Sequence, residues 1–572
     1  MAKKDYSNWS KEELVRELKK IEKRKKYGIV WEDKPEQVAL LCKEKLPILA
    51  EDKSKEIVTD KEKSNHILIE GDNYHALSVL NYTHKGKIDV IYIDPPYNTG
   101  NNTWKYNNNY IERDDPFKHS KWLSFIFKRL TLAKNLLKPN GIIIVAIDDY
   151  EIFPLGLLMD EIFGESNRLA TITVLNKKSG RTTDKFFATC HEYYLVYAKN
   201  VNNAKIGEFT VDQSSLESYK YQDEISRYKW RDFLRTGGYS TPEERPNSYY
   251  SIYYNAKTGK ISVEKIKDSI EIWPIDSKGK KRVWRQTRPS LMRLVDQGDI
   301  KIEKTKQGKF TVRIKDRIKT IMKPKTVWDD PKYDAATHGT KLLEKILGQA
   351  RTFEFPKSLY AVKDAIKIAT DNPRAIILDF FAGSGTTAHA VLELNKDDKG
   401  NRKFILCTNN ENNNGNGSGG IMEEVCYPRV KKVIQNLEKE SKGKLVKNMP
   451  GNLKYFKTDF VDAEPTDRNK KKMVDKSTEM LCLKEDCFDE AIKGQDFKIF
   501  TNSQSKNLGI IYDDDGIEPF KKEIKKLKKK FVVYVFSLDE SAREEEFEDV
   551  AEWVELKPIP AVILNVYKRI FK

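Results

Sequence analysis

The chain has 572 residues, more than one ordinary hydrophobic core organises, so we expect two to four domains. Lys and Arg number 103 against 86 Asp and Glu, and the formal charge of +17 favours a polyanionic partner, although a solvated lysine-rich surface would give the same balance. The six cysteines contain no C-x-x-C pair, which argues against metal and disulfide frameworks, and the lack of an apolar run of membrane-spanning length indicates a soluble, cytoplasmic or nucleoid-associated protein.

The first predicted helix begins near Ser10, whose hydroxyl can cap it, with Glu13 three residues further on. Apolar residues at helical spacing then continue to a basic run at 23–26. An assembly or DNA-contacting arm and a solvated amphipathic helix both fit this pattern.

Strands and helices alternate after residue 61. Strands are expected at 66–70, 88–93 and 142–147, and helices at 73–80 and 121–137. This alternation predicts a parallel sheet with right-handed crossovers.

Four residues, Asp94-Pro95-Pro96-Tyr97, directly follow the apolar strand at 88–93. A carboxylate, two prolines without N–H groups and an aromatic ring form a rigid slot that suits a flat ring bearing an amino group. Asp94 can accept one hydrogen of the NH2 group, the carbonyl of Pro95 can accept the second, and Tyr97 can stack on the ring. An ordinary strand-to-loop turn is the alternative, since proline often ends strands.

Between about 200 and 350 the alternation stops, and aromatic and basic residues interleave. Such side chains stack on bases or donate bidentate hydrogen bonds, which suits recognition of grooves and phosphates. For any single residue, a core aromatic or a surface cation is the commoner role. The candidate DNA contacts are Arg227, Lys229, Trp230, Arg231, Arg245, Arg282, Trp284 and Arg285.

A second motif follows a short apolar run at 375–378. Residues 379–387 are Asp-Phe-Phe-Ala-Gly-Ser-Gly-Thr-Thr, and the small residues at 382–385 let backbone approach a ligand at the carboxyl end of a strand. A nucleoside triphosphate site and a nucleoside cofactor site both use such turns. Because the lysine of a phosphate-binding loop and the G-x-G-x-x-G pattern are both missing, phosphate binding is disfavoured, and a plain glycine turn is the structural alternative.

The remaining elements complete the pattern. Helices are expected at 359–369 and 388–394, a strand at 404–407 and an Asn/Gly-rich mobile loop at 412–420. Past residue 445, strands at 508–512 and 531–536 flank a basic helix at 518–528, which predicts a small α/β unit that could bind DNA or a partner subunit.

The two motifs resemble the D-P-P-Y and F-x-G-x-G signatures of the S-adenosylmethionine-dependent amino-methyltransferases that act on DNA; the second signature is Phe381, Gly383 and Gly385 here. D-P-P-Y comes first, which is the circularly permuted order of the β class. Within that class the chain is similar to the Mod subunits of Type III restriction-modification systems and to related stand-alone adenine methyltransferases.

The resemblance implies an α/β, Rossmann-like methyltransferase fold, circularly permuted, with the F-x-G-x-G strand beside the D-P-P-Y strand. The implied domains are an N-terminal helical arm at 1–60, the catalytic half of the core at 61–200, an inserted target-recognition domain at 201–350, the cofactor-binding half at 351–445 and a C-terminal α/β accessory domain at 446–572.

The implied activity is methyl transfer from S-adenosylmethionine to N6 of a flipped adenine in duplex DNA, without a metal. The catalytic residues would be Asp94, Pro95, Pro96 and Tyr97. The cofactor contacts would be Asp72, Asn98, Phe355, Pro356, Lys357, Ser358, Asp379, Phe381, Gly383, Ser384, Gly385, Thr386, Asn409 and Glu411. Ser358 replaces a frequent second proline, and the residue on the cofactor ribose stays open between the asparagines at 409–410 and Glu411.

Three alternatives remain. N4-cytosine methylation uses the same geometry, but that subgroup more often carries Ser in place of Asp94. RNA methylation is disfavoured by the long recognition region, and a DNA-binding module with an inactive core is disfavoured by the intact Asp94, Tyr97 and Gly383. The implied partners are double-stranded DNA, a second copy of the chain and a helicase-nuclease restriction subunit.

Overall fold

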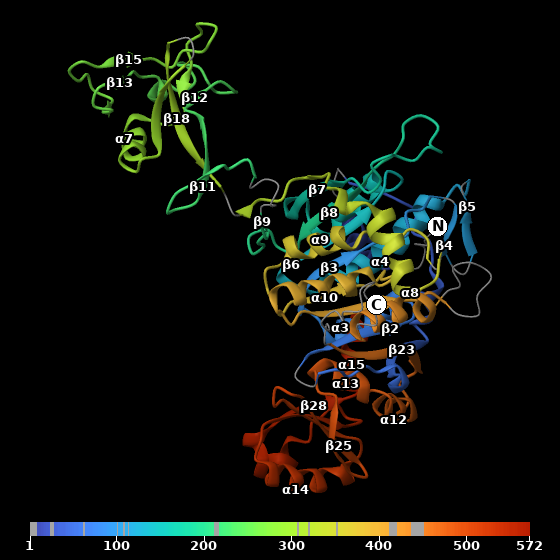
Figure 1. Ribbon diagram of the computed structural model, residues 1–572. Helices are drawn as coiled ribbons and strands as arrows, with labels where there is room; N and C mark the ends of the chain where they lie inside the picture. Colours follow the sequence, from blue (N-terminus) through green and yellow to red (C-terminus); the bar gives the residue numbers. More distant parts are fainter. Residues whose placement is uncertain are drawn as a thin grey trace. The chain divides into compact units, whose positions relative to one another are not determined.

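The computed structural model describes residues 9–22, 28–60, 63–99, 101–106, 109–112, 114–210, 217–305, 308–318, 321–350, 353–410, 420–435 and 451–571. They divide into two compact units, which we call unit 1 (residues 1–207 and 324–572) and unit 2 (residues 208–323) (Figure 1). The basic run at 23–26, Glu411 and nearly all of the expected loop at 412–420 lie outside the described residues.

The core of unit 1 is a ten-stranded sheet in the order β1-β23-β2-β22-β21-β3-β6-β8-β7-β20. Its central strands β2 (Asn65–Glu70), β22 (Lys403–Thr408), β21 (Ile376–Asp379), β3 (Ile88–Ile93) and β6 (Leu137–Ile147) are parallel. Strand β8 (Glu192–Ala198) runs antiparallel between β6 and β7 (Arg168–Val174). The outer strands are β1 (Lys45–Glu51), β23 (Asn452–Asp462) and β20 (Val327–Trp328). The predicted α/β fold with its parallel sheet is confirmed.

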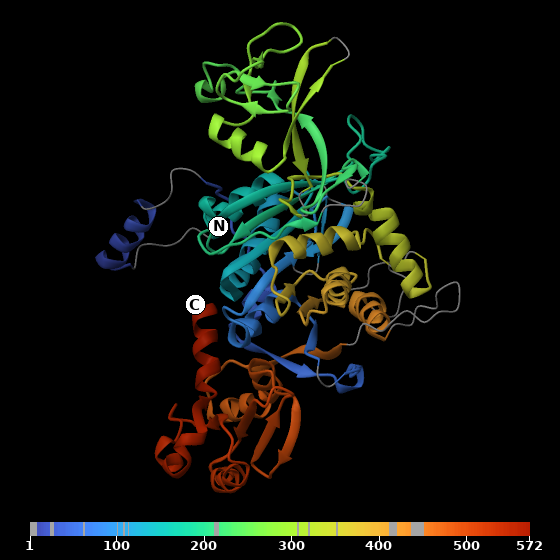
Figure 2. The ribbon, with the colours of Figure 1, turned by 60° about the vertical axis from the view of Figure 1, so that its left-hand side comes forward.

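Helices cover both faces of this sheet because the central strands are apolar on both faces. Figure 2 shows one layer in blue to teal and the other in yellow to orange. The first layer contains α3 (Asn73–Thr83), α4 (Lys118–Leu136) and α5 (Ile152–Phe163), and the second contains α8 (Lys341–Leu347), α9 (Leu359–Ala369), α10 (Thr386–Asp398) and α11 (Tyr427–Gln435). Shorter or peripheral elements are α1 (Lys11–Glu22), α2 (Gln37–Leu41) and the hairpin of β4 (Asn101–Tyr106) and β5 (Asn109–Glu112).

Strand β6 differs from the expectation. The sequence predicts a helix that ends at 137 and a strand that begins at 142, yet β6 already begins at Leu137, which pairs with Ile88. The register shifts between Ile88 and Val90, and this irregularity keeps the Pro-containing segment extended. A Cβ on Gly141 would lie 3.1 Å from the Ile88 carbonyl oxygen, so the glycine permits close approach of the two strands.

The C-terminal part of unit 1 is a five-stranded sheet in the order β24-β25-β26-β27-β28. Its strands are β24 (Asp489–Lys493), β25 (Phe497–Thr501), β26 (Asn507–Ile511), β27 (Phe531–Phe536) and β28 (Val554–Ile559), and its helices are α12 (Asp467–Asp475), α13 (Thr478–Glu485), α14 (Ile517–Leu527) and α15 (Ala561–Ile570). The expected strand, basic helix and strand are present. Helices α13 and α15 pack on α3, which joins this part to the main hydrophobic core.

Unit 2 has its own small core around Phe233, Tyr250 and Trp284. Its main sheet is antiparallel, in the order β10 (Tyr221–Gln222), β11 (Arg227–Asp232), β18 (Phe310–Arg317) and β17 (Ile300–Lys304), and α7 (Arg288–Asp296) packs beside β17. Small sheets are formed by β12 (Leu234–Arg235) with β16 (Val283–Trp284), by β13 (Ile252–Tyr254) with β14 (Ile261–Ser262) and β15 (Ile270–Ile272), and by β9 (Phe209–Thr210) with β19 (Ile321–Met322). Residues 324–350, expected in the recognition domain, belong to unit 1.

Within the described residues, no helix combines the length and apolar character that crossing a membrane requires.

Candidate active site

The two sequence motifs meet at neighbouring strand ends. Strand β3 pairs with β21 in parallel, through Val90 with Ile377 and Ile91 with Leu378, so Asp94 and Asp379 follow at the same edge of the sheet. Burial and the nearby charge of Asp94 raise the pKa of Asp379 to about 7. The expected adjacency of the two motif strands is therefore observed.

Lys357 reaches into the D-P-P-Y pocket. Its Nζ lies 2.9 Å from Oδ1 of Asp94 and 3.3 Å from Oε2 of Glu192, and it lies over the ring of Tyr97 at 4.7 Å from the centroid. The sequence places Lys357 among the cofactor contacts, and in the structure its ammonium contacts the carboxylates of Asp94 and Glu192. The two acidic neighbours raise its pKa despite burial.

Glu192 was not predicted from the sequence. It begins β8, its side chain is 5% exposed, and its Oε2 accepts hydrogen bonds from Asn176 Nδ2 at 3.0 Å and from the Tyr97 hydroxyl at 3.4 Å. Burial raises its pKa, and Lys357 opposes that rise. The available signal was an acidic residue at the start of an otherwise apolar strand.

The prolines of the motif are fixed from α4. Trp122 is fully buried, and its Nε1 donates a 2.7 Å hydrogen bond to the carbonyl of Pro96. This bond fixes the orientation of the peptide between Pro96 and Tyr97.

Asn98 is buried with a left-handed φ of 57°. Its Nδ2 donates at 2.5 Å to Oε1 of Glu151, the oxygen that also lies 2.6 Å from Nδ1 of His119. The amide therefore ties this loop to the N-cap residue of α5, and the cofactor contact of Asn98 stays a prediction.

The turn after β21 is stabilised from within. Oδ1 of Asp379 accepts from the Phe381 N–H at 2.9 Å, and Oδ2 accepts from the Thr387 hydroxyl at 2.6 Å. Gly383 and Gly385 have φ values of 47° and 74°, which favour glycine. A Cβ on Gly385 would lie 3.2 Å from Sγ of Cys426, so packing against the protein, in addition to backbone shape, requires this glycine.

Arg429 was also missed by the sequence analysis. It is fully buried on α11, and its Nη1 donates to Oγ1 of Thr386 at 2.8 Å and to Oγ of Ser384 at 3.2 Å. It forms no ion pair within the described residues, and burial lowers its pKa to about 10. The guanidinium thus stabilises the glycine turn through hydrogen bonds from α11.

The end of β2 is tied to the same turn. Asp72 caps α3 by accepting from the Tyr74 N–H at 2.7 Å and lies 3.4 Å from Nη2 of the buried Arg129. The next residue, Asn73, donates to the Phe380 carbonyl at 3.0 Å. This bond ties the first residue of α3 to the turn after β21.

The segment before α9 contributes two different surfaces. Phe355 has a φ of 59° and a side chain that is 79% exposed, so its ring is open to a ligand. Ser358 is buried and donates to the Lys332 carbonyl at 2.8 Å, and Pro356 packs against Gly339. Asn409 directly follows β22, between the ends of β2 and β21.

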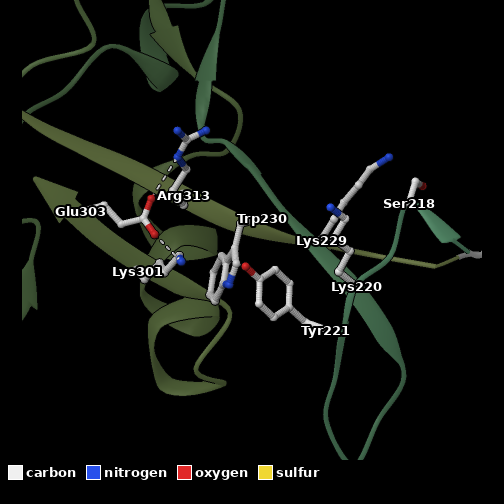
Figure 3. A pocket seen from close by; sticks show the side chains of 8 residues that line it. All are labelled: Ser218, Lys220, Tyr221, Lys229, Trp230, Lys301, Glu303 and Arg313. Atoms are coloured by element: carbon white, nitrogen blue, oxygen red, sulfur yellow. Dashed lines mark ion pairs between the residues drawn. The ribbon is translucent and has the colours of Figure 1, made fainter. Parts of the chain in front are cut away.

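One face of the main sheet of unit 2 carries aromatic rings and ion pairs, in which Lys315 and Arg317 contact Asp223 and Asp299. Tyr228 pairs with Arg317 and Trp230 with Lys315, and Lys301 lies over Trp230 at 4.3 Å from the ring centroid. The opposite face enters the core. A pocket of about 290 Å³ lies on this sheet. Figure 3 shows the side chains that line it, which are those of Ser218, Lys220, Tyr221, Lys229, Trp230, Lys301, Glu303 and Arg313.

The other predicted DNA contacts divide by burial. Trp284 is 2% exposed, stacks on Phe233, and donates to the Tyr250 carbonyl at 2.8 Å, so it is a core residue with no face free for a base. Arg282 is paired with Asp276 at 2.9 Å. The side chains of Arg227 and Arg231 are exposed, while those of Arg245 and Arg285 are partly exposed.

No group of three or more His, Cys, Asp or Glu side chains is arranged to hold a metal ion in the described part of the chain.

Residues 88–414 match a family model described as DNA methylase. The chain is 32% identical over 464 residues to the EcoPI Mod subunit, a Type III restriction-modification enzyme of Escherichia phage P1, covering 75% of this chain and 71% of the relative. It is 36% identical over 342 residues to the Type II methyltransferase M.KpnI of Klebsiella pneumoniae, covering 59% and 79%. The crystal structure of the M1.HpyAVI-SAM complex aligns at 15% identity and a TM-score of 0.29, covering 65% of this chain and 100% of that one.

Proposed function

The chain belongs to the DNA methylase family, and on that premise we propose that it transfers a methyl group from S-adenosylmethionine to N6 of an adenine flipped out of duplex DNA. The observation that carries this proposal is the D-P-P-Y slot beside the glycine turn, on adjacent parallel strands.

The residues present fit an S-adenosylmethionine molecule. Three neighbouring strand ends, those of β2, β22 and β21, carry in turn the partly exposed carboxylate of Asp72, the amide of Asn409 and the glycine turn. A nucleoside amine, a ribose and an amino-acid moiety need hydrogen-bond partners of these kinds in a row. The exposed ring of Phe355 supplies an apolar contact. When bound, the sulfonium supplies an activated methyl group.

The protein side of the reaction is electrostatic. Asp94 and the Pro95 carbonyl accept the two amine hydrogens, and they favour the positive charge that develops on N6 as the new bond forms. Tyr97 offers its face to the ring, and the Trp122 bond to Pro96 keeps the slot rigid. Flipping the base out of the duplex costs roughly a few kcal/mol. Contacts between the flipped base and the D-P-P-Y slot offset this cost.

Asp94 decides the proposed product. A carboxylate matches the adenine amine in this family, whereas a serine is more frequent at this position in N4-cytosine enzymes. Mass spectrometry of nucleosides from DNA methylated by the purified chain tests this: N6-methyladenine is expected, and N4-methylcytosine would overturn the product assignment.

Unit 2 is the proposed target-recognition domain. Its sheet face of aromatic and charged side chains suits contacts with bases and phosphates. Exchanging residues 208–323 for the corresponding domain of a relative should therefore move methylation to a new adenine-containing site. Retention of the old site would reject the assignment.

The Type III Mod relatives support a role as the modification subunit of a restriction-modification system, acting on DNA in the cytoplasm. We propose a dimer that can join a helicase-nuclease subunit. Light scattering with and without a short duplex tests the dimer, and a monomer under both conditions would remove it.

A further inference from the structure

The carboxylate of Asp94 is already occupied by a cation from its own chain. Lys357 Nζ lies 2.9 Å from Oδ1 of Asp94, and its side chain is only 11% exposed. The ammonium also lies over the Tyr97 ring. A target amine would make the same two contacts, because it would donate to Asp94 while its base stacks on Tyr97. Lys357 and the substrate amine therefore compete for one place.

Glu192 is a second carboxylate that can bind the Lys357 ammonium. Its Oε2 is 3.3 Å from Lys357 Nζ, and hydrogen bonds from Asn176 and the Tyr97 hydroxyl hold that carboxylate in position. Neither bond depends on Lys357. A buried carboxylate requires a cation or hydrogen-bond donors, so a lysine that left Asp94 would still be stabilised at Glu192.

The chemistry requires such a move. Positive charge develops on N6 during transfer, and an ammonium beside Asp94 would oppose it, since like charges at short range inside a protein repel strongly. In the free protein the same ammonium is useful, because it pairs with the Asp94 carboxylate, which is 27% exposed, and keeps it oriented.

We propose that Lys357 is a positioning residue that stands in for the target amine at Asp94 before DNA binds and shifts to Glu192 when the flipped base enters. This inference rests on the proposed methyltransferase function.

The titratable and charged groups around Lys357 come from four strands and one loop. They are Tyr92, Asp94 and Tyr97 on or after β3, Asp148 after β6, Asp379 at the end of β21, Glu192 and Tyr194 on β8, and Arg181 near Asp148. Burial raises the pKa of Asp148 to about 6, so Asp148 and Asp379 can both titrate in the wild type and in every variant. The informative quantity is therefore the difference between variant and wild-type pH profiles.

The test is single-turnover methylation of a duplex across pH, with cofactor binding measured by calorimetry. In Lys357→Met, Asp94 and Glu192 repel without a cation between them and share a proton at higher pH. We expect the acidic limb of the pH–rate profile to move to higher pH by about one unit or more. The rate at neutral pH should fall by roughly tenfold or more, and the affinity for the cofactor should stay within about twofold of the wild-type value. The double variant Lys357→Met/Glu192→Gln should return the limb toward wild type. Lys357→Arg, which preserves the charge, should leave the limb in place.

Glu192→Gln gives an independent readout. Without the Glu192 carboxylate, Lys357 stays paired with Asp94. We therefore expect weaker base flipping, measured with 2-aminopurine at the target position, and a higher Michaelis constant for DNA. Cofactor affinity should be unchanged. This arm holds even if Lys357→Met fails to fold.

Other outcomes would contradict the inference. A Lys357→Met protein that loses cofactor binding and keeps the wild-type acidic limb would return Lys357 to the cofactor site. Normal base flipping in Glu192→Gln would overturn the shift of Lys357 to Glu192. If the wild type methylates no DNA, the proposed function itself fails.

Discussion

The two units present their sheets in opposite ways. The sheet of unit 1 is covered by helices on both faces, so ligands can reach it only at strand ends, where Asp94 and Asp379 lie. The main sheet of unit 2 buries one face through Ile300 and Val312 and leaves rings and cations on the other. Chemistry on one amine needs few groups held rigidly, and these are found at buried strand ends. Recognition of a long polyanion needs a broad polar face, which a half-covered antiparallel sheet provides.

Charged side chains follow the same division. In unit 1 the cations of Lys357, Arg129 and Arg429 are buried, and each is held by identified partners. In unit 2, Lys301 and Arg313 lie on the same face of the sheet as Trp230 and are 33% and 32% exposed. We therefore expect substitutions in unit 1 to act through geometry and those on the open face of unit 2 to act through affinity and its salt dependence.

The largest effect should follow removal of the Asp94 carboxylate. Asp94→Ala is expected to reduce methyl transfer by at least ~10²–10³, the loss typical of one oriented transition-state contact, while cofactor binding largely survives. Asp467→Ala, which removes an exposed carboxylate of unit 1, is the control. Single-turnover rates and calorimetry check this, and joint loss of both properties would move Asp94 to the cofactor pocket.

A glycine pair compares the two units directly. Gly385 and Gly259 share a φ of 74°, but a Cβ would meet Cys426 at 3.2 Å in the first and nothing within 4 Å in the second. Both Val variants carry backbone strain of about 1–2 kcal/mol or more. Only Gly385→Val should abolish cofactor binding in a folded protein. Calorimetry on both variants decides, and normal binding by Gly385→Val would mean that the cofactor loop has been misplaced.

A tryptophan pair within unit 2 separates its core from its open face. Trp284→Ala should destabilise unit 2 by about 3–5 kcal/mol, since it deletes a buried indole. Trp230→Ala should instead weaken duplex binding, by roughly 1–3 kcal/mol if a base stacks there, with little change in unfolding. Urea denaturation and fluorescence anisotropy measure the two effects. Equal destabilisation by both variants would contradict the proposed open recognition face.

Acid should act on unit 1 first. Burial lowers the pKa of His66 and of His84 from 6.5 to about 3, and all seven histidines lie outside unit 2. Between pH 6.5 and pH 3 these histidines bind protons in the unfolded chain but stay neutral in the folded chain. Their contribution to the free energy of unfolding is therefore fully present above pH 6.5 and is lost as pH falls toward 3. The loss is up to about 1.4 kcal/mol per pH unit for each histidine. Denaturation of wild type and His84→Gln at pH 7 and 5.5 checks this: the variant should lose less, and equal losses would contradict it.

Local patterns predicted most elements of the sheet. The strands at 66–70 and 88–93 were expected from apolar runs and flanking turns, and the structure has them within one residue of those bounds. The strand conformation of residues 138–141 was not expected, because their Pro-Asn-Gly sequence favours a turn. In the structure a register shift against β3 keeps this segment in a strand.

The α/β class, the order of the two motifs and the residues of the D-P-P-Y motif can be read from the chain alone, because each depends on a few neighbouring residues and on the period of apolar side chains. The contacts of Lys357 with Asp94 and Glu192, the hydrogen bonds from Arg429 to the glycine turn and the burial of Trp284 are seen only in the folded protein. Those contacts join residues far apart in the chain, and a local pattern carries no information on which distant side chain will fill a given place when the layers pack.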